Sequence, residues 1–377
     1  MIFRKPTRRV EIRGLGMGGF EPIRIQSMTS TPTTDVKATL RQIRRLQKAG
    51  CELVRLAVPD KESVETFAQI RIQTDLPLIA DIHFDYRLAL GALKAGADKI
   101  RVNPGNIGGK ERALAVGQEA AARGVPIRIG VNSGSVEKDL LKKYGEPTPA
   151  ALVESTLRHV ELMSSVTGLQ IVLSLKASDA LTTIEAYRAI SEKTDWPLHL
   201  GVTEAGTPFT GSIRSAVGIG TLLAEGIGDT LRVSLTGDVV EEIKVAWEIL
   251  RSLGLRRRGI ELISCPTCAR AEVDLIGIAT RVEKALADVK EPLRVAVMGC
   301  AVNGPGEARG ADVGVACGKK KGLIFRGGKI LRTVSEGQIV DELVREVRDL
   351  LRIRCSSKNS PAAIWSASNA AKRSPKR

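Results

Sequence analysis

Short β-branched runs and amphipathic helical patterns alternate along the chain from Pro22 to about Leu253. Eight apolar runs predict strands: Ile23–Met28, Leu53–Val58, Leu78–Phe84, Lys99–Asn103, Ile127–Asn132, Gln170–Lys176, Leu198–Val202 and Thr230–Leu235. Helical patterns such as Asp35–Ala49, Lys61–Gln73, Tyr86–Ala95, Pro149–Ser164 and Ala180–Lys193 lie between them, several ending in Gly. This order predicts an α/β fold with a closed (β/α)8 TIM-type barrel. An open doubly wound sheet is the alternative, but no Gly-x-Gly-x-x-Gly turn follows the first strand.

The repeat stops after Arg256-Arg257-Arg258-Gly259, and a smaller α+β pattern follows. Its expected strands are Ile260–Ser264, Leu293–Val297, Val313–Ala316, Gly322–Phe325 and Ile330–Arg332, and its expected helices are Glu272–Asp288 and Glu336–Leu351. We therefore predict a barrel domain at residues 1–253, an α+β domain at 254–355 and a disordered basic tail at 356–377.

The net charge of +15 is concentrated at the two ends of the chain. Residues 352–377 contribute +7 and residues 1–13 contribute +4. Only 3% of the residues are aromatic, which argues against a base-stacking nucleic-acid surface. No apolar run has the length of a membrane span or of a secretory signal, and six cysteines suit a reducing cytoplasm.

Polar residues inside the predicted strands point to a binding site. Residues two apart on a strand share a face, and these polar side chains fall toward the carboxyl ends, where barrel enzymes build active sites. The anion-binding and hydrogen-bonding candidates are Arg55, Arg101, Asn103, Arg128, Asn132, Ser174, Lys176, Arg232 and Ser234. Several guanidinium groups and one ammonium favour a polyanion such as a diphosphate. Asp81, His83 and Glu204 are the proton-transfer candidates, with Glu204 favoured for its place at the rim; His199 is interpreted as structural.

Cysteines mark the smaller domain. Cys265-Pro266-Thr267-Cys268 is followed by Cys300, and the Asn303-Gly304-Pro305-Gly306 turn brings Glu307 back toward Cys300. Three thiolates with a carboxylate or an open position suit a cubane iron–sulfur cluster. The spacing also allows a zinc site completed by Cys317, a redox dithiol or buried inert thiols. The run Lys319-Lys320-Lys321 is either a solvated turn or a docking patch for an acidic electron carrier.

A series of motifs, in order, resembles the bacterial 4-hydroxy-3-methylbut-2-enyl diphosphate synthase family of the methylerythritol phosphate pathway. The resemblance runs from about Arg8 to Arg352. It rests on Gln26-Ser27-Met28-Thr29, Ala80-Asp81-Ile82-His83-Phe84, Arg101-Val102-Asn103-Pro104-Gly105-Asn106-Ile107-Gly108, Ile129-Gly130-Val131-Asn132-Ser133-Gly134-Ser135, Ser174-Leu175-Lys176-Ala177-Ser178, Gly201-Val202-Thr203-Glu204-Ala205-Gly206, Ser264-Cys265-Pro266-Thr267-Cys268, Gly299-Cys300 and Asn303-Gly304-Pro305-Gly306-Glu307.

This resemblance implies a cytoplasmic, homodimeric oxidoreductase with a [4Fe-4S] cluster held by Cys265, Cys268, Cys300 and Glu307, and Cys317 as a bystander. It implies reductive ring opening and dehydration of 2-C-methyl-D-erythritol 2,4-cyclodiphosphate, with two electrons from reduced flavodoxin or ferredoxin. Glu307 then has a catalytic role as the ligand that gives way to substrate. We expect the short linker near Leu253–Gly259 to favour an active site shared between two chains.

Two other functions fit parts of the sequence. A metal-independent barrel lyase or aldolase would form a Schiff base on Lys176 and use zinc to stabilise the second domain. An RNA-binding protein would use the basic ends of the chain. Neither explains both the strand arginines and the Cys/Glu motif.

Overall fold

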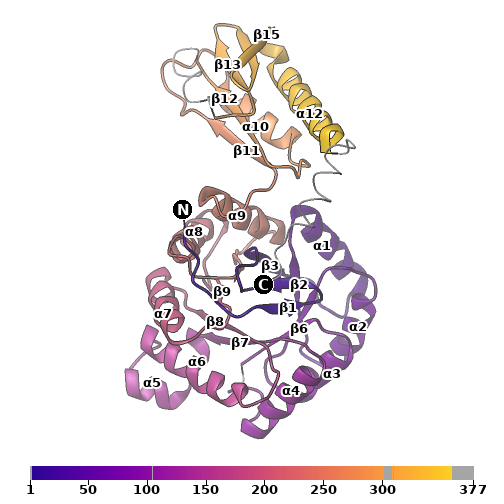
Figure 1. Ribbon diagram of the computed structural model, residues 1–377, viewed down its shortest axis with the longest axis vertical. Coiled ribbons are helices and arrows are strands. Elements are labelled where there is room, and N and C mark those ends of the chain that lie inside the picture. Colours follow the sequence, from indigo (N-terminus) through magenta and orange to yellow (C-terminus); the bar gives the residue numbers. More distant parts are fainter. Residues whose placement is uncertain (1, 104, 301–307, 309, 359–377) are drawn as a thin grey trace, which may run out of the picture. The chain divides into compact units, whose positions relative to one another are not determined.

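The computed structural model describes residues 2–103, 105–300, 308 and 310–358. Its chain divides into two compact units, Met1–Arg256 and Arg257–Arg377, which meet three residues beyond the expected boundary at 253. Figure 1 shows each unit as a sheet with its own helices. Among the described residues, no helix has the length and apolar character needed to cross a membrane.

The first unit is a barrel of eight parallel strands. They are β3 (Arg24–Met28), β4 (Leu53–Ala57), β5 (Leu78–Asp81), β6 (Lys99–Val102), β7 (Ile127–Asn132), β8 (Ile171–Lys176), β9 (His199–Leu200) and β10 (Thr230–Leu231). The hydrogen-bonded order is β8-β7-β6-β5-β4-β3-β10-β9, and a bridge from Leu173 to Leu198 joins β8 to β9. The predicted closed barrel is therefore confirmed.

Helices surround these strands (Figure 1). They are α1 (Val36–Ala49), α2 (Lys61–Arg71), α3 (Tyr86–Lys94), α4 (Lys110–Ala122), α5 (Lys138–Tyr144), α6 (Pro149–Ser164), α7 (Ala180–Lys193), α8 (Pro208–Ala224) and α9 (Val239–Ser252), with a short 3-10 turn at Ser133–Ser135. Aspartates begin α1, α2, α3, α7 and α9 because their carboxylates accept the unpaired backbone N–H groups of the first turn. Gly50 ends α1 in the left-handed conformation that glycine adopts without strain.

A short antiparallel hairpin closes the N-terminal end of the barrel. It consists of β1 (Val10–Ile12) and β2 (Leu15–Met17), and the sequence analysis did not predict it. Its residues Val10, Ile12 and Met17 form a buried cluster with Leu53, Ile79 and Val172 of the barrel strands. The opposite end, where the strands terminate, is thus the only end of the described barrel left for a binding site.

The second unit has a five-stranded mixed sheet. Strands β11 (Ile260–Ser264), β12 (Leu293–Met298) and β13 (Val313–Gly318) are parallel, whereas β14 (Lys321–Arg326) and β15 (Lys329–Ser335) continue antiparallel. Helices α10 (Leu275–Ala285) and α12 (Ile339–Lys358), which a 3-10 turn at Glu336–Gln338 precedes, pack together on one face of this sheet. Helix α12 continues three residues into the predicted tail, and the Ser356 side-chain Oγ donates a hydrogen bond to the Arg352 carbonyl oxygen one turn earlier.

Candidate active site

Strand alternation decides which barrel side chains face the interior. Leu53, Ile79 and Val172 face inward, because they pack against the closing hairpin. Residues two or four positions later on the same strands face inward as well, toward the open end. These are Arg55, Asp81, Ser174 and Lys176. The alternation used in the sequence analysis therefore places the candidate residues in one interior space.

Asp81 lies at the centre of a group of three partners. Its carboxylate is 3.5 Å from Arg55 Nε, 3.3 Å from Arg101 Nη1 and 3.5 Å from His83 Nε2. Burial raises the pKa of Asp81, but Arg55, His83 and Arg101 outweigh it and hold that pKa well below its usual value. Asp81 is thus an ionised anchor for two arginines, and His83, about half exposed at 53%, is the member open to a substrate.

Arg232 is anchored differently. Its guanidinium forms a paired contact with Glu242 of α9, with Nη2 3.2 Å from Oε1 and Nε 3.3 Å from Oε2. The same carboxylate accepts hydrogen bonds from Ser27 Oγ at 2.8 Å and from the Leu235 backbone at 3.1 Å. Glu242 was not among the sequence candidates, because a glutamate on an amphipathic helix reads as a solvated residue; in the structure it is 2% exposed.

Arg128 and Lys176 have no carboxylate partner among the described residues. Arg128 is 1% exposed, and its Nε and Nη1 atoms have no hydrogen-bond acceptor in the described part of the chain. Burial, followed by the charges of Arg55 and Arg101, lowers the pKa of Arg128 well below its usual value. Burial and four arginines lower the pKa of Lys176 in the same way. Cations held together without counter-charges are a site prepared for an anion.

Gly201 makes room for Lys176. A side-chain Cβ at this position would lie 2.4 Å from Lys176 Nζ and 2.8 Å from the Arg232 carbonyl oxygen. Only a residue without a side chain can therefore follow His199 and Leu200 here while Lys176 keeps its position.

The neutral candidates lie at strand ends. Asn103 is 4% exposed and its Oδ1 accepts a hydrogen bond from Gly105 N at 3.1 Å, whereas Ser174 is 2% exposed inside β8. Asn132 ends β7 and precedes the 3-10 turn, and its backbone N–H bonds to Ser135 Oγ. Ser234 follows the short strand β10 and is half-buried. The strand around it is shorter than predicted, because pairing in β10 stops at Leu231.

Glu204 lies on an exposed loop after β9. Its Oε2 atom accepts a hydrogen bond of 2.5 Å from Ser178 Oγ, which follows β8. Its backbone φ of 52° falls in the left-handed region, where a non-glycine residue is strained. The rim position was expected, and the exposure of this carboxylate is the new finding.

His199 faces the interior below Lys176. The two nitrogens His199 Nε2 and Lys176 Nζ are 3.5 Å apart, and the histidine is fully buried. Its backbone carbonyl accepts a 2.5 Å hydrogen bond from Tyr187 Oη. Lys99 and Gln26 face the same interior and were missed as candidates, although Lys99 stands two positions before Arg101 and the same alternation would have indicated it.

The cysteines lie at the ends of neighbouring parallel strands in the second unit. Cys265 follows β11, and Cys300 comes two residues after β12. The Gly299 backbone N–H donates to Cys265 Sγ at 3.2 Å, which is how proteins stabilise a thiolate ligand. Cys268 is exposed, and hydrogen bonds from Arg270 lower its pKa. These thiols suit a soft metal or an iron–sulfur cluster.

The rest of the predicted cluster site is incomplete in the structure. Glu307 lies outside the described residues, as do residues 301–306. Among the described residues, no three His, Cys, Asp or Glu side chains come together as a metal-binding group. Cys317 is buried in β13, and burial raises the pKa of its thiol to about 12, which disfavours the thiolate form needed for a ligand.

Comparisons with known proteins match both units. Residues 7–247 match the GcpE TIM-barrel domain, and residues 261–349 match the GcpE protein C-terminal domain. Curated relatives include proteins from Clostridium perfringens, 56% identical over 92% of this chain and 99% of theirs, and Geobacter sulfurreducens, 55% identical over 92% and 98%. A relative from Brevibacillus brevis is 54% identical over 93% and 98%. All three bear the name 4-hydroxy-3-methylbut-2-en-1-yl diphosphate synthase (flavodoxin).

Proposed function

The chain belongs to the GcpE family, and from this premise we propose that it is a 4-hydroxy-3-methylbut-2-en-1-yl diphosphate synthase of isoprenoid biosynthesis. This oxidoreductase converts 2-C-methyl-D-erythritol 2,4-cyclodiphosphate, by reductive ring opening and dehydration, to the hydroxymethylbutenyl diphosphate. The observation that carries the proposal in the structure is the excess of buried cations at the open end of the barrel. The lyase or aldolase alternative loses its support, because the relatives carry the synthase name.

Substrate binding follows from the interior charges. Arg128 and Lys176 have no described carboxylate partner, so their N–H donors are available to the diphosphate. Asp81 orients Arg55 and Arg101, and Glu242 orients Arg232. Guanidinium groups bind phosphate oxygens in pairs, which fixes the orientation as well as the position of the ring. Asn103, Asn132, Ser174 and Ser234 supply neutral hydrogen bonds to the remaining oxygens.

We propose that Cys265, Cys268, Cys300 and Glu307 hold a [4Fe-4S] cluster. The support within the described residues is the pair of adjacent strand ends and the backbone N–H that bonds to Cys265 Sγ. When bound, the cluster supplies electrons and a Lewis-acid position for C–O cleavage. Glu307 would hold the cluster through a carboxylate, which exchanges more readily than a thiolate.

The proposed proton-transfer residues, Glu204 and His83, lie around the mouth of the barrel. Glu204 is exposed and carries a hydrogen bond from Ser178, so it can deliver a proton to the departing hydroxyl and recover one from solvent. His83 can assist, because Asp81 orients its ring from below at 3.5 Å. Asp81 itself stays ionised and positions its partners.

Reduced flavodoxin is the electron donor named for the relatives, and we propose it for this chain as well, with ferredoxin as a substitute. Lys319, Lys320 and Lys321 are all exposed where β13 turns into β14. This confirms the expected turn and leaves an exposed positive patch for an acidic carrier. We place the enzyme in the cytoplasm, where such carriers act.

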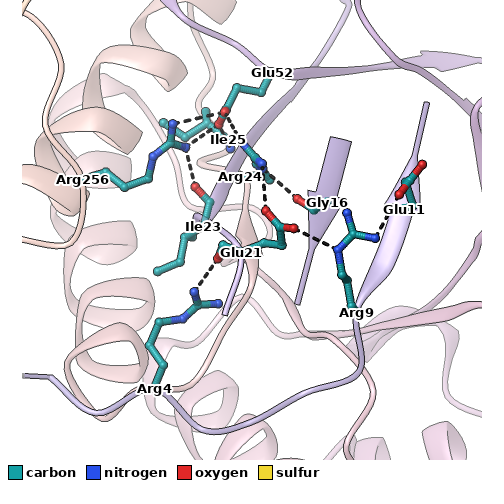
Figure 2. A network of polar contacts seen from close by, with 10 residues as sticks. All are labelled: Arg4, Arg9, Glu11, Gly16, Glu21, Ile23, Arg24, Ile25, Glu52 and Arg256. Carbon is teal, nitrogen blue, oxygen red and sulfur yellow. Dashed lines mark hydrogen bonds and ion pairs between the residues drawn. The ribbon is translucent and has the colours of Figure 1, made fainter. Parts of the chain in front are cut away.

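We propose that the enzyme is a homodimer whose active site combines two chains. Arg256 ends the barrel unit at the closed end, where it contacts the Ile23 carbonyl oxygen at 2.6 Å and Glu52 at 2.6 Å (Figure 2). The barrel unit therefore ends on the side opposite its substrate mouth. This position and the short linker after it are our reasons for proposing a site shared with a partner chain. Phe209, Ile213 and Val217 form an exposed apolar stripe along α8, with exposed fractions of 78%, 50% and 49%, which supports a barrel-to-barrel contact.

The decisive test uses protein purified without air. We expect stoichiometric iron and sulfide, a brown chromophore, and conversion of the cyclic diphosphate with reduced flavodoxin. Cys300→Ser should remove the chromophore, whereas Glu307→Ala should keep most of the cluster and lose turnover. Colourless, iron-free protein, or wild-type turnover by Glu307→Ala, would refute the proposed centre.

The shared site has its own test. A chain with Arg128→Met and a chain with Cys300→Ser should each be inactive alone. Mixing them under conditions that exchange subunits should restore part of the activity, because one site of each mixed dimer then combines two intact halves. No recovery in demonstrably mixed dimers would refute sharing.

A further inference from the structure

The barrel interior holds a group of strand side chains whose polar atoms have no partner among the described residues. These atoms are Gln26 Nε2 and Oε1, Lys99 Nζ, Arg128 Nε and Nη1, His199 Nδ1 and Thr230 Oγ1. All five residues come from barrel strands, and each is 1% exposed or less. Buried groups of this kind are costly in an apolar core, where each unmet hydrogen bond destabilises the fold.

Lys99 is the most unusual member of this group. It is fully buried at the start of β6 and faces the interior, because Arg101 two residues later contacts Asp81 there. In the strand register, Lys99 lies beside Ile79 of β5, an apolar neighbour that offers no counter-charge. A lysine in such a place is stable mainly in its neutral form.

The groups around Lys99 are mostly cations. Arg128 on β7 and Arg55 on β4 both act on its ammonium, and Lys99 in turn acts on His199 of β9. Lys176 on β8 and Arg232 after β10 add further positive charge to the same interior. The two carboxylates of this region are already engaged: Asp81 with Arg55, Arg101 and His83, and Glu242 with Arg232 and Ser27. The Tyr187 hydroxyl is bonded to the His199 carbonyl oxygen.

We propose that Lys99 is a concealed cation of the diphosphate site, neutral in the free enzyme and protonated from solvent when the cyclic diphosphate binds above it. The proposal rests on the proposed function, since it assigns a further residue to the same anion site. The proton comes from the buffer, which is left as its conjugate base, so the complex gains one positive charge for each proton taken up.

The physical reason is a change in the field at Lys99. In the free protein, burial and two arginines lower the pKa of this ammonium well below its usual value. A diphosphate carrying two negative charges near Arg55 and Arg128 cancels that repulsion and adds attraction, both of which favour the charged form. By linkage, the same proton strengthens binding of the anion, so affinity should rise as the pH falls from the pKa of Lys99 in the complex to its lower pKa in the free enzyme.

The test is isothermal titration calorimetry of the oxidised holoenzyme, which binds the cyclic diphosphate without turning it over. Titrations at one pH in two buffers of small and large ionisation enthalpy give the number of protons exchanged. We expect net proton uptake by the wild type and a clear loss of that uptake in Lys99→Met, together with binding weaker by about tenfold or more. The matched control is Lys94→Met, the same chemical change on the exposed surface of α3, which should alter neither value.

Thermal unfolding separates this role from a structural one. Lys99→Met removes a buried amine without a partner, so its melting temperature should be equal to or above that of the wild type. A lower melting temperature together with unchanged proton uptake would make Lys99 a structural residue and overturn the proposal. Should Lys99→Met not fold, the wild-type titration still decides, because binding without buffer dependence overturns it.

Two other outcomes are informative. If proton uptake remains in Lys99→Met, the proton goes to Lys176 or His199 and the assignment to Lys99 is wrong. If the cyclic diphosphate does not bind at all, the proposed function fails, and inorganic diphosphate serves as the second probe. Binding of inorganic diphosphate with proton uptake that Lys99→Met abolishes would then keep the inference standing without the proposed substrate.

Discussion

The two ends of the barrel treat positive charge in opposite ways. At the closed end, three arginines have carboxylate partners within hydrogen-bond distance: Arg9 bonds to Glu21 and Glu11 at 2.9 Å, Arg24 to Glu52 at 3.0 Å and Arg256 to Glu52 at 2.6 Å (Figure 2). Toward the open end, Arg128 and Lys176 have no carboxylate partner among the described residues, and neither has Lys99, which lies deeper in the interior beside Ile79.

This difference separates two uses of the same residue types. The closed-end network joins the hairpin, the strand starts and the last residue of the barrel unit, so its charges are neutralised to hold the chain together. The open-end cations have no counter-charge, which lowers the stability of the free protein, and in the proposed function the bound anion offsets this cost. Changes at the open end should therefore reduce function and spare the fold, and changes at the closed end should do the reverse.

The largest effect is expected for Arg128→Met. The loss of an unpaired, buried guanidinium should reduce kcat/KM at least about a hundredfold, because charged hydrogen bonds to a desolvated anion contribute roughly 2–5 kcal/mol. The melting temperature should not fall. Steady-state kinetics and calorimetric unfolding of the same preparation measure both, and a destabilised variant with normal kcat/KM would contradict the comparison.

Glu52→Gln tests the closed end. Glu52 receives hydrogen bonds from Arg24, Arg256 and the Ile25 backbone, and its side chain is only 18% exposed. We expect the free energy of unfolding to fall by about 2 kcal/mol, reduced by partial solvent screening, with kcat/KM unchanged. Glu11→Gln, a half-exposed partner of Arg9, is the control and should change stability by less than about 0.5 kcal/mol.

The pH dependence of stability sharpens the contrast. The folded protein holds the pKa of Lys99 below its unfolded value, so the unfolded chain binds more protons between those two values. Stability therefore rises with pH through this window. The free energy of unfolding of Lys99→Met should exceed that of the wild type by about 1 kcal/mol or more at pH 7. This difference should disappear near pH 10.4, roughly the pKa of a lysine in the unfolded chain. Denaturant titrations at a series of pH values measure the difference; an advantage that grew with pH would contradict the assignment.

The smallest effect concerns the rim. Glu204 holds a left-handed backbone, so Glu204→Gly should raise the free energy of unfolding by about 0.5–1 kcal/mol. Turnover should nevertheless fall, because the carboxylate is lost. Glu204→Gln, which keeps the side-chain length, should lower turnover without the gain in stability. Equal turnover in all three proteins would remove Glu204 from the mechanism.

Strand alternation explains how much of this site the sequence could predict. The eight-strand repeat and the two-residue spacing correctly brought Arg55, Asp81, Arg101 and Lys176 into one interior, because backbone pleating leaves a strand residue only two faces. The same rule places Lys99 in the interior as well. It was not among the candidates, because a lysine at the start of a strand is usually a solvent-exposed residue at the strand boundary.

Contacts between distant elements could not be predicted in this way. Glu242 is an ordinary helical position until α9 packs beside β10 and β3, and the closing hairpin has strands of only three residues. The exposure of Glu204 depends on a loop conformation that neither propensity nor periodicity encodes. For the cysteines, the strand ends place Cys265 near Gly299. The ligand roles of Cys265, Cys268, Cys300 and Glu307 stay predictions.

Gly201 has a consequence for inhibitors aimed at this mouth. An added methyl group there would displace the Lys176 amine while every ionisable side chain stayed in the sequence. A single uncharged substitution at this crowded glycine is therefore expected to give resistance to a phosphate-mimicking drug. Screening for resistance should include this codon alongside those of the arginines that such a drug would touch.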